Sequence, residues 1–357
     1  MKFRKYLTYA AAALTAVSFA SCSDDNDDPK PVICPAANPG LFIVNNGNYG
    51  TPNASLSFYD LTTNTINNNV FATANGIPLG EVAQSVTIDG NSAFIAVNLS
   101  NKVYAINANN YEIEAEITDH VSSPRYFVKI SDDKYYLSQM NNRRIGVYEK
   151  EMSGYKYVKD IEVSSATGGN EYIIVAGNYA YTNAWSYGKT LAKIDIINDK
   201  VEDQLEVGVQ PESIAYCETS NSLWVLCDGG GWEQNPIGYE APSLVEIDLA
   251  SFTKKQTITL PMGSTSKLCY HEGALYWLTA GKGVTKMDLA SKTISDHISI
   301  ASYGIYALTI SPANGDIYVA DALDYTQNGV VYSYDLAGNK IGDFKVGIIP
   351  AGFAWKF

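Results

Sequence analysis

The sequence predicts an all-β fold, a seven-bladed β-propeller with four antiparallel strands in each blade. A short pattern returns seven times, in which a strand-like run ends in Asp, Asn or Glu and a turn and a polar strand follow. Successive end residues lie 47, 42, 46, 53, 40 and 47 positions apart. A period in the forties with several short strands per unit is typical of propeller blades. The end residues are Asp60, Asn107, Glu149, Asp195, Asp248, Asp288 and Asp335.

One repeat shows the four strands most plainly. Residues 85–88 form a first strand, and the turn at Asp89-Gly90-Asn91 leads to a second strand over residues 93–97. A variable loop follows, then the strand that ends at Asn107, then a polar outer strand over residues 111–117. The same order returns around the turn at residues 314–316. Four strands of this kind make one antiparallel blade.

The two ends of the chain predict how the ring closes. Residues 350–357 have the pattern of a first strand without its partners, and residues 41–44 that of a second strand without its predecessor. Joined, they complete one blade, so we expect the C-terminal strand to pair with the N-terminal blade. This closure would remove the exposed sheet edges that an open array presents.

The N-terminus predicts export and lipidation. Basic residues precede an apolar run over residues 7–20, and Cys22 follows two small residues. This arrangement resembles a bacterial lipobox, which implies that residues 1–21 are a lipoprotein signal peptide and that Cys22 carries the lipid. Residues 22–40 would then be the lipidated Cys and an acidic tether, and residues 41–357 the propeller. The alternative is a plain secreted protein in which this Cys is incidental.

The tether and the overall charge point to a location and exclude some partners. Residues 23–29, with four Asp, resemble the acidic export signal of Bacteroidetes surface lipoproteins, which implies an outer-membrane anchor that faces the cell exterior. The net charge of −13 repels phosphates, so we expect no nucleic acid partner. Beyond the N-terminus, no run approaches the roughly 20 apolar residues of a membrane-spanning helix.

Groups that could support catalysis or hold a metal are sparse. The three His residues, His120, His271 and His297, occupy different positions of the repeat, which argues against a metal cluster. No hydrolase elbow, zinc-protease motif or phosphate-binding loop occurs. Asp321 and Asp324 could bind Ca²⁺ through their carboxylates, although a solvated surface is the simpler interpretation. We therefore expect neither an enzyme nor a catalytic cofactor.

Four further Cys residues could be paired or free. They lack metal-ligand spacing, and an oxidising compartment would permit disulfides. Cys217 and Cys227 would flank one hairpin but are offset from direct opposition, so buried thiols are favoured over a disulfide. The four are Cys34, Cys217, Cys227 and Cys269.

The candidate binding site lies on one face of the predicted ring. In a propeller the loops between second and third strands share a face with the connections between blades, and function concentrates on such loops. Here these loops are irregular and rich in aromatic and amide groups, which suit a bulky, partly apolar ligand. Some of the rings could instead only pack the loops together. The candidates are Asn48, Tyr49, Arg125, Arg143, Trp185, Tyr187, Trp232, Tyr239 and Tyr325.

Several of these loops carry a family resemblance. The segments that carry it include Asn45-Asn46-Gly47-Asn48-Tyr49, Ser123-Pro124-Arg125-Tyr126, Ala184-Trp185-Ser186-Tyr187 and Val346-Gly347-Ile348-Ile349-Pro350. Over residues 41–357 the chain resembles the seven-bladed, YncE-like surface lipoproteins of Bacteroidetes, which include the BtuG-type cobalamin-binding propellers.

The resemblance implies a ligand and a partner. It implies that the protein binds cobalamin and other corrinoids without changing them chemically, and passes them to a TonB-dependent outer-membrane transporter. The alternative is a surface adhesin or glycan-binding propeller without corrinoid binding. A lyase-type enzyme on the same fold is a weaker third possibility, because fold alone does not exclude catalysis.

Overall fold

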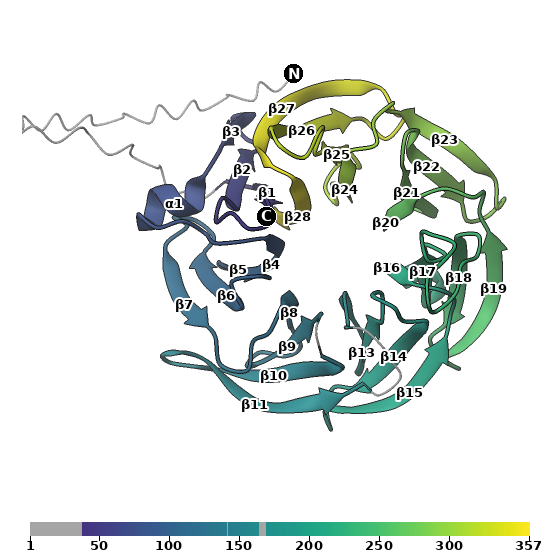
Figure 1. The fold of residues 1–357 in the computed structure, drawn as a ribbon, viewed down its shortest axis with the longest axis horizontal. Helices are drawn as coiled ribbons and strands as arrows, with labels where there is room; N and C mark the ends of the chain where they lie inside the picture. The colour runs from purple at the N-terminus through teal and green to yellow at the C-terminus, as the bar shows by residue number, and fades with distance from the viewer. Residues whose placement is uncertain (1–37, 141, 164–168) are drawn as a thin grey trace, which may run out of the picture. The chain divides into compact units, whose positions relative to one another are not determined.

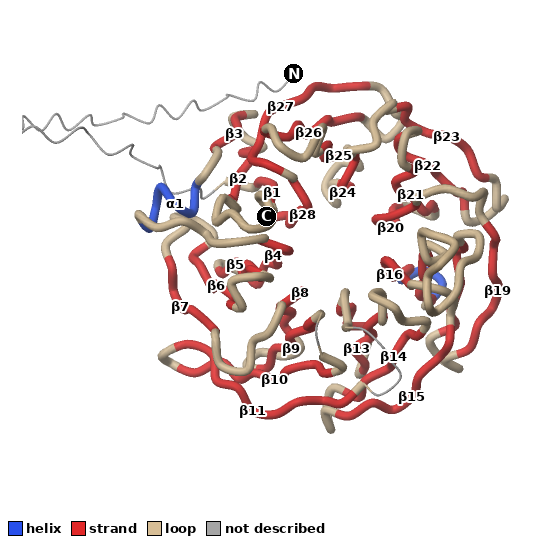
Figure 2. Tube along the Cα trace, viewed as in Figure 1, coloured by secondary structure: helices blue, strands red, loops and turns tan. Residues whose placement is uncertain are grey.

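The computed structural model describes residues 38–140, 142–163 and 169–357, which form seven four-stranded antiparallel sheets. The sheets are arranged around a common axis as the blades of a β-propeller (Figure 1). Strands and loops make up nearly all of this part of the chain (Figure 2). The predicted signal peptide, Cys22, Cys34 and most of the tether lie outside the described residues. The predicted fold class is confirmed.

The first blade joins the two ends of the chain in the order β28-β1-β2-β3. Its strands are β28 (Pro350–Lys356), β1 (Gly40–Asn45), β2 (Ser55–Asp60) and β3 (Thr65–Asn67). Leu41 of β1 pairs with Trp355 of β28 on one side and with Tyr59 of β2 on the other. The indole N–H of Trp355 also donates to Thr309 of the seventh blade, at 2.9 Å. The C-terminal strand therefore closes the ring, as the sequence predicts.

The other six blades each use four consecutive strands. Their innermost strands are β4 (Ala83–Asp89), β8 (Pro124–Lys129), β12 (Ile173–Ala176), β16 (Pro211–Cys217), β20 (Thr265–His271) and β24 (Ile305–Ile310). The second strands are β5 (Ser92–Val97), β9 (Lys134–Gln139), β13 (Tyr179–Asn183), β17 (Ser222–Cys227), β21 (Ala274–Thr279) and β25 (Ile317–Asp321). The third are β6 (Lys102–Asn107), β10 (Arg144–Glu151), β14 (Thr190–Asp195), β18 (Ser243–Asp248), β22 (Gly283–Asp288) and β26 (Asn328–Tyr334). The outer strands are β7 (Ile113–Ile117), β11 (Gly154–Glu162), β15 (Lys200–Glu206), β19 (Thr253–Thr259), β23 (Ile294–Ser299) and β27 (Lys340–Ile348).

The hydrophobic core is divided among the interfaces between neighbouring blades. Most second and third strands are largely buried on both faces, and in β17 every residue is buried. Between the first two blades the rings of Phe42 and Phe58 lie 4.8 Å apart, and Phe71 packs on Tyr104 at the same distance. Each of the seven buried clusters spans two adjacent sheets. Large rings between the sheets explain the high aromatic content of the chain.

The acidic end of the repeated pattern caps the turn between the third and outer strands. In the sixth blade, Asp288 Oδ1 accepts the backbone N–H of Ala290 at 3.1 Å and of Ser291 at 2.7 Å. These bonds from Ser291 hold the pKa of Asp288 below its ordinary value. Equivalent bonds from the second or third following residue form at Asp60, Asn107, Asp195 and Asp248, whereas Asp335 accepts the backbone N–H of Asn339, four residues later. The side chain satisfies backbone donors that no strand partner reaches.

Two features of the fold bear on the remaining predictions. Cys217, Cys227 and Cys269 are free thiols, and across the hairpin Cys217 pairs with Ser222 rather than with Cys227. The connection between the first two blades contains the helix α1 (Val70–Asn75), which the sequence analysis missed. Across the described ranges, no helix has the length and apolar character needed to cross a bilayer.

Candidate ligand-binding site

One face of the propeller, the loop face, carries the connections from second to third strands together with the connections between blades. Its largest loop, residues 228–242, joins β17 to β18 and accounts for the widest spacing in the repeat. Shorter loops at residues 46–54, 184–189 and 322–327 belong to the first, fourth and seventh blades. The innermost strands all begin at this face, so their first residues surround the axis (Figure 1).

A β-bulge near the start of the innermost strand recurs in six blades. In β4, Ala83 pairs with Val97 and Ser85 with Ala96, which leaves Gln84 without a partner in the ladder. The corresponding register shifts leave out Arg125 in β8, Glu212 in β16, Lys267 in β20, Tyr306 in β24 and Ala351 in β28. A bulge re-aims a side chain that would otherwise follow the alternation of the strand. All six of these residues line one pocket on the axis.

The backbone is strained next to several of these bulges. Val82, Gln210 and Ile349 each precede an innermost strand, with φ values of 54°, 50° and 54°. Lys267 lies within its bulge at a φ of 60°. Positive φ is uncommon for residues other than glycine and costly for β-branched ones, and such strain clusters at functional sites. Strained backbone of this kind also occurs in turns elsewhere, and these four residues place some of it at the axial pocket.

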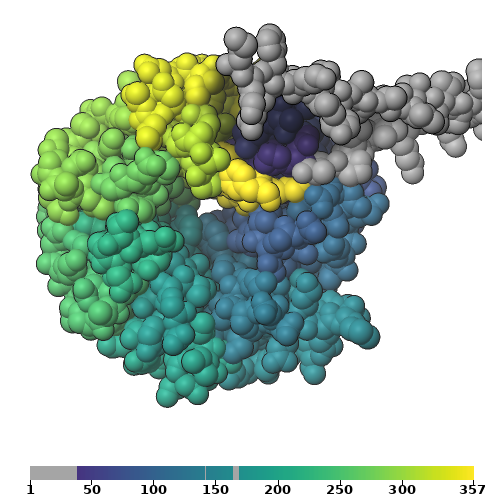
Figure 3. All heavy atoms as spheres, turned by 180° about the vertical axis from the view of Figure 1, so that it is seen from behind, coloured from purple at the N-terminus to yellow at the C-terminus, as the bar shows by residue number. Residues whose placement is uncertain are grey.

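The axial pocket has a volume of about 400 Å³ and is lined by residues of all seven blades. Besides the six bulge residues, the lining includes Asn46, Trp185, Asp228 and residues 264–266. A space-filling view of the reverse side shows a hollow at the centre of the ring (Figure 3). Pockets of this volume are typical of small-molecule sites.

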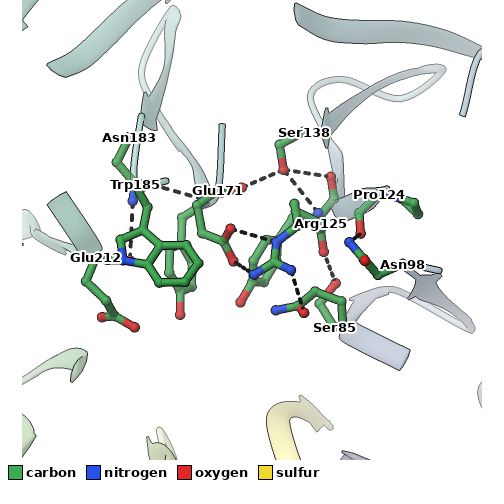
Figure 4. A network of polar contacts seen from close by, with 12 residues as sticks. Ser85, Asn98, Pro124, Arg125, Ser138, Glu171, Asn183, Trp185 and Glu212 are labelled. Atoms are coloured by element: carbon green, nitrogen blue, oxygen red, sulfur yellow. Dashed lines mark hydrogen bonds and ion pairs between the residues drawn. The ribbon is translucent and has the colours of Figure 1, made fainter. Parts of the chain in front are cut away.

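Arg125 forms the best-defined polar contact at the pocket. Its Nε and Nη2 donate to the two carboxylate oxygens of Glu171 at 2.7 and 2.6 Å, and Nη1 donates to Gln84 at 2.7 Å. Glu171 lies between Arg125 and Trp185 (Figure 4). Burial disfavours the charged guanidinium, but the adjacent Glu171 outweighs it and raises the pKa of Arg125. The cation is therefore fixed in place and already neutralised.

A second ion pair lines the pocket from the fifth and sixth blades. Lys267 Nζ lies 3.3 Å from Glu212 Oε1, and the backbone N–H of Lys267 donates to Glu212 Oε2 at 2.9 Å. Lys267 also donates to the Tyr172 hydroxyl at 3.3 Å, and the Tyr172 ring stacks on Tyr126. Burial opposes the charge on Lys267, but Glu212 raises its pKa, so the amine remains protonated. Burial also keeps both tyrosines neutral by raising their pKa well above the ordinary value.

Asp228 connects the pocket to the longest loop. Its carboxylate accepts the indole N–H of Trp185 at 3.1 Å, the side-chain amide of Gln210 and the backbone N–H of Gly230. Burial raises the pKa of Asp228 despite these donors, and the nearby Glu212 acts in the same direction. The carboxylate thus positions Trp185 and the start of the 228–242 loop at the edge of the pocket.

Exposed apolar side chains lie on the loops around this pocket. Tyr49 in the first blade is 85 % exposed, and Tyr303, between the sixth and seventh blades, is 82 % exposed. The rings of Tyr187 and Trp232 form an edge-to-face pair 6.1 Å apart across the fourth and fifth blades. The rim, as we call this set, comprises Tyr49, Tyr187, Trp232, Tyr239, Met262, Tyr303 and Tyr325.

The structure places all nine sequence-predicted residues on the loop face but in different environments. Asn48 donates to the backbone carbonyl of Tyr325 at 2.8 Å, which joins the first and seventh blades. Trp185 and Arg125 line the pocket, although the Arg125 guanidinium is already bound to Glu171. Arg143 is exposed and does not line the pocket. The rings of Tyr49, Tyr187, Trp232, Tyr239 and Tyr325 belong to the rim.

Most of the polar lining of the pocket and part of the rim were not among the predicted site residues. Gln84, Glu212, Lys267 and Tyr306 occupy the same place in their blades as Arg125. Alignment of the repeats at the start of the first strand would have brought them together. Tyr303 and Met262 lie in connections between blades, whereas the predicted aromatic residues all lie in loops between second and third strands.

The proposed calcium ligands have structural partners. Asp321 is buried and accepts from the Ser302 hydroxyl at 2.9 Å and from the Leu323 N–H at 2.8 Å. Asp324 caps the turn over Thr326 and Gln327. Within residues 38–140, 142–163 and 169–357, no group of three His, Cys, Asp or Glu is placed to hold a metal ion.

The fold and the pocket define the class as a seven-bladed β-propeller with an axial cavity on its loop face. The chain belongs to the family described as "Domain of unknown function (DUF5074)", whose model matches residues 39–351. None of the curated proteins matches the sequence. The family match does not single out YncE-like or BtuG-type proteins, so that finer resemblance stays a prediction.

Solved structures share the fold at low sequence identity. A quinonprotein alcohol dehydrogenase-like protein from Bacteroides thetaiotaomicron superposes with a TM-score of 0.64 at 12 % identity, covering 89 % of this chain and 78 % of its own. Hydrazine synthase from Kuenenia stuttgartiensis gives 0.63 at 14 % identity, with 76 % and 88 % covered. The computationally designed Ika8 protein gives 0.59 at 11 %, with 88 % and 90 % covered. These likenesses concern the fold alone.

Proposed function

We propose that this protein is a cell-surface lipoprotein that binds cobalamin and other corrinoids at the loop face and passes them to a TonB-dependent outer-membrane transporter. The observation that carries the proposal is the axial pocket, lined by all seven blades and bordered by exposed aromatic rings on the same face. The sequence resemblance to corrinoid-binding surface propellers adds the identity of the ligand and of the partner.

The dimensions of the pocket suggest how such a ligand would be held. A corrinoid is a broad, nearly flat macrocycle with several amide arms, and it is larger than a cavity of about 400 Å³. The macrocycle would therefore lie across the mouth of the pocket, and only a part of the ligand would enter it. The exposed rings of Trp232 and Tyr239 would supply apolar contact, about 0.5–1.5 kcal/mol for each well-placed ring beyond its buried area.

We also propose that the ligand is bound without chemical change. A lyase-type reaction would depend on Asp228, because it is the lining carboxyl group whose pKa is raised. Its oxygens, however, already accept from Trp185, Gln210 and Gly230. A carboxylate with its lone pairs occupied in this way is poorly placed to take a proton from a substrate.

Calorimetric titration of residues 38–357, which contain all seven closed blades, with cyanocobalamin and cobinamide tests the binding. We expect saturable heat with one site per chain, and protein that stays red after gel filtration. Colourless protein and the absence of heat would reject corrinoid binding. A glycan array on the same sample addresses the adhesin alternative, which strong glycan hits beside absent corrinoid binding would favour. Mass analysis of the recovered ligand checks that it is unchanged.

Two matched variants locate the binding surface. Trp232→Ala removes an exposed ring from the rim, and we expect cobinamide affinity to fall about five- to tenfold, in line with about 1 kcal/mol per ring contact. Ile197→Ala removes an exposed apolar side chain from the turn after β14, on the opposite face, and should leave affinity unchanged. Equal losses of affinity in the two variants would argue against binding at the loop face.

A further inference from the structure

The axial pocket combines paired charges with unpaired neutral groups. Arg125 is bound to Glu171, Lys267 to Glu212, and Asp228 to three N–H donors. Asn46 Oδ1 and Thr265 Oγ1, in contrast, are buried without any hydrogen-bond partner among the described residues. Both residues line the pocket, with exposed fractions of only 8 % and 5 %. Buried polar atoms are nearly always bonded, so these two atoms offer hydrogen-bonding capacity that a molecule in the pocket can take up.

Each of the two orphan groups can bond one of the polar groups of a primary amide. An Asn side-chain oxygen only accepts, and it fits an amide N–H, whereas a Thr hydroxyl can donate to an amide carbonyl. The charged groups of the pocket disfavour an ionised ligand. An anion would compete with Glu171 or Glu212 for its cation, and separating a buried ion pair leaves one charge uncompensated. Asp228 would repel it further.

From these observations we infer that the axial pocket is a subsite for a neutral carboxamide arm of the ligand and discriminates against the corresponding carboxylate. The inference rests on the proposed corrinoid binding and specifies which part of the ligand enters the ring. In this arrangement the macrocycle rests against the rim, and one amide arm reaches the level of Asn46 and Thr265. The paired charges then favour neutral polar groups of the ligand over ionised ones.

Two corrinoids that differ in the charge of their arms test this discrimination, with the full chain as the binding protein. Cobinamide carries amide arms, whereas in cobyrinic acid the arms are carboxylates. We expect cobyrinic acid to bind about 100-fold more weakly or worse, because a charge would enter a site whose own charges are already paired. The net charge of the protein also repels an anion, so the comparison is repeated in about 1 M NaCl, where the Debye length is about 3 Å. The discrimination should persist there.

A matched pair of variants tests the subsite itself. Thr265→Val removes the orphan hydroxyl with little change of shape, and it should weaken cobinamide binding about five- to tenfold through loss of one hydrogen bond. Thr182 in β13 also has a buried hydroxyl without a partner, but it does not line the pocket. Thr182→Val should leave affinity unchanged, and melting curves confirm that both variants are folded.

The outcomes separate the inference from the function on which it rests. Failure of both corrinoids to bind the unaltered chain would overturn the proposed function and the inference together. Binding of cobyrinic acid within about threefold of cobinamide in high salt would overturn the inference alone, since the paired charges would then not discriminate. Equal affinities of the Thr265→Val and Thr182→Val variants would do the same.

Discussion

Arg125 of the third blade and Glu171, which precedes the first strand of the fourth, join two neighbouring blades through a bidentate ion pair of 2.6 and 2.7 Å. The pair is buried next to the propeller axis, and its backbone is held as well: Arg125 O accepts the Ser85 hydroxyl and Glu171 O accepts the Ser138 hydroxyl. The ion pair therefore connects three blades at the level where the ligand pocket begins.

Glu171→Gln should destabilise the fold strongly, because it leaves the Arg125 cation buried without a counter-charge. Loss of one partner of a buried ion pair costs about 3–5 kcal/mol, and urea unfolding measures it. Lys340→Met provides the control, since its pair with Asp343 is half exposed and its loss should leave the unfolding midpoint unchanged. Similar midpoints for the two variants would show that the Arg125 pair is not buried in solution.

The turn caps predict how stability responds to acid. Hydrogen bonds from Ser291 hold the folded-state pKa of Asp288 below its unfolded value, so ionisation stabilises the fold above about pH 4, and this stability is lost as pH falls through the folded-state pKa. Asp288→Asn should keep the turn, as Asn107 does in the second blade, but remove this pH dependence. Asp288→Ala should lose stability throughout the neutral range. Chemical unfolding at a series of pH values distinguishes the two.

Titration of Asp228 should change the stability of the fold with pH in the opposite direction to that of Asp288. Burial raises its folded-state pKa, so the folded chain holds this proton more tightly than the unfolded chain. Stability contributed by protonated Asp228 is therefore present below the unfolded value of about 3.9 and lost as pH rises through the folded-state pKa. Because the Trp185 indole donates to this carboxylate, the fluorescence difference between the unaltered chain and Trp185→Phe should report the titration. A midpoint at or below the unfolded value would contradict this prediction.

Removal of residues 350–357 should destroy cooperative unfolding. The deletion exposes the edge of β1 and removes the strand that joins the first blade to the seventh, and open edges favour aggregation. Light scattering and thermal unfolding monitor the loss. Removal of Phe357 alone, which is 66 % exposed, should leave the melting temperature unchanged. A cooperatively folding chain without residues 350–357 would disprove closure through the C-terminal strand.

Lipidation of Cys22 can be tested in a bacterial host that processes lipoproteins. We expect radiolabelled palmitate on the unaltered chain and none on Cys22→Ser, which should move from the membrane fraction to the soluble fraction. Cys217→Ser is the matched control, because this buried thiol lies within the fifth blade and its substitution should not change labelling. Labelling of Cys22→Ser would disprove the lipobox assignment.

The repeat could be recognised from sequence because its cause is local. An Asp such as Asp288, at the end of a third strand, bonds backbone groups two and three residues later in the chain. Rim residues such as Tyr49 and Trp232 were also predictable, because large rings in loops have no strand to pack. The bulges could not be predicted from the sequence. The alternation of side chains along a strand assigns Glu212 and Lys267 to a blade face, and only the register shift directs them to the axis.

The closing strand has one further consequence. Gly40, at the start of β1, pairs with Lys356, at the end of β28, so the first and last strand residues are neighbours at the face opposite the pocket. A fluorophore, an affinity tag or a sensor chip attached at either end of the propeller would leave the mouth of the pocket unobstructed. The protein is thus suited to oriented immobilisation, in which every molecule on a surface presents its binding face to the solution.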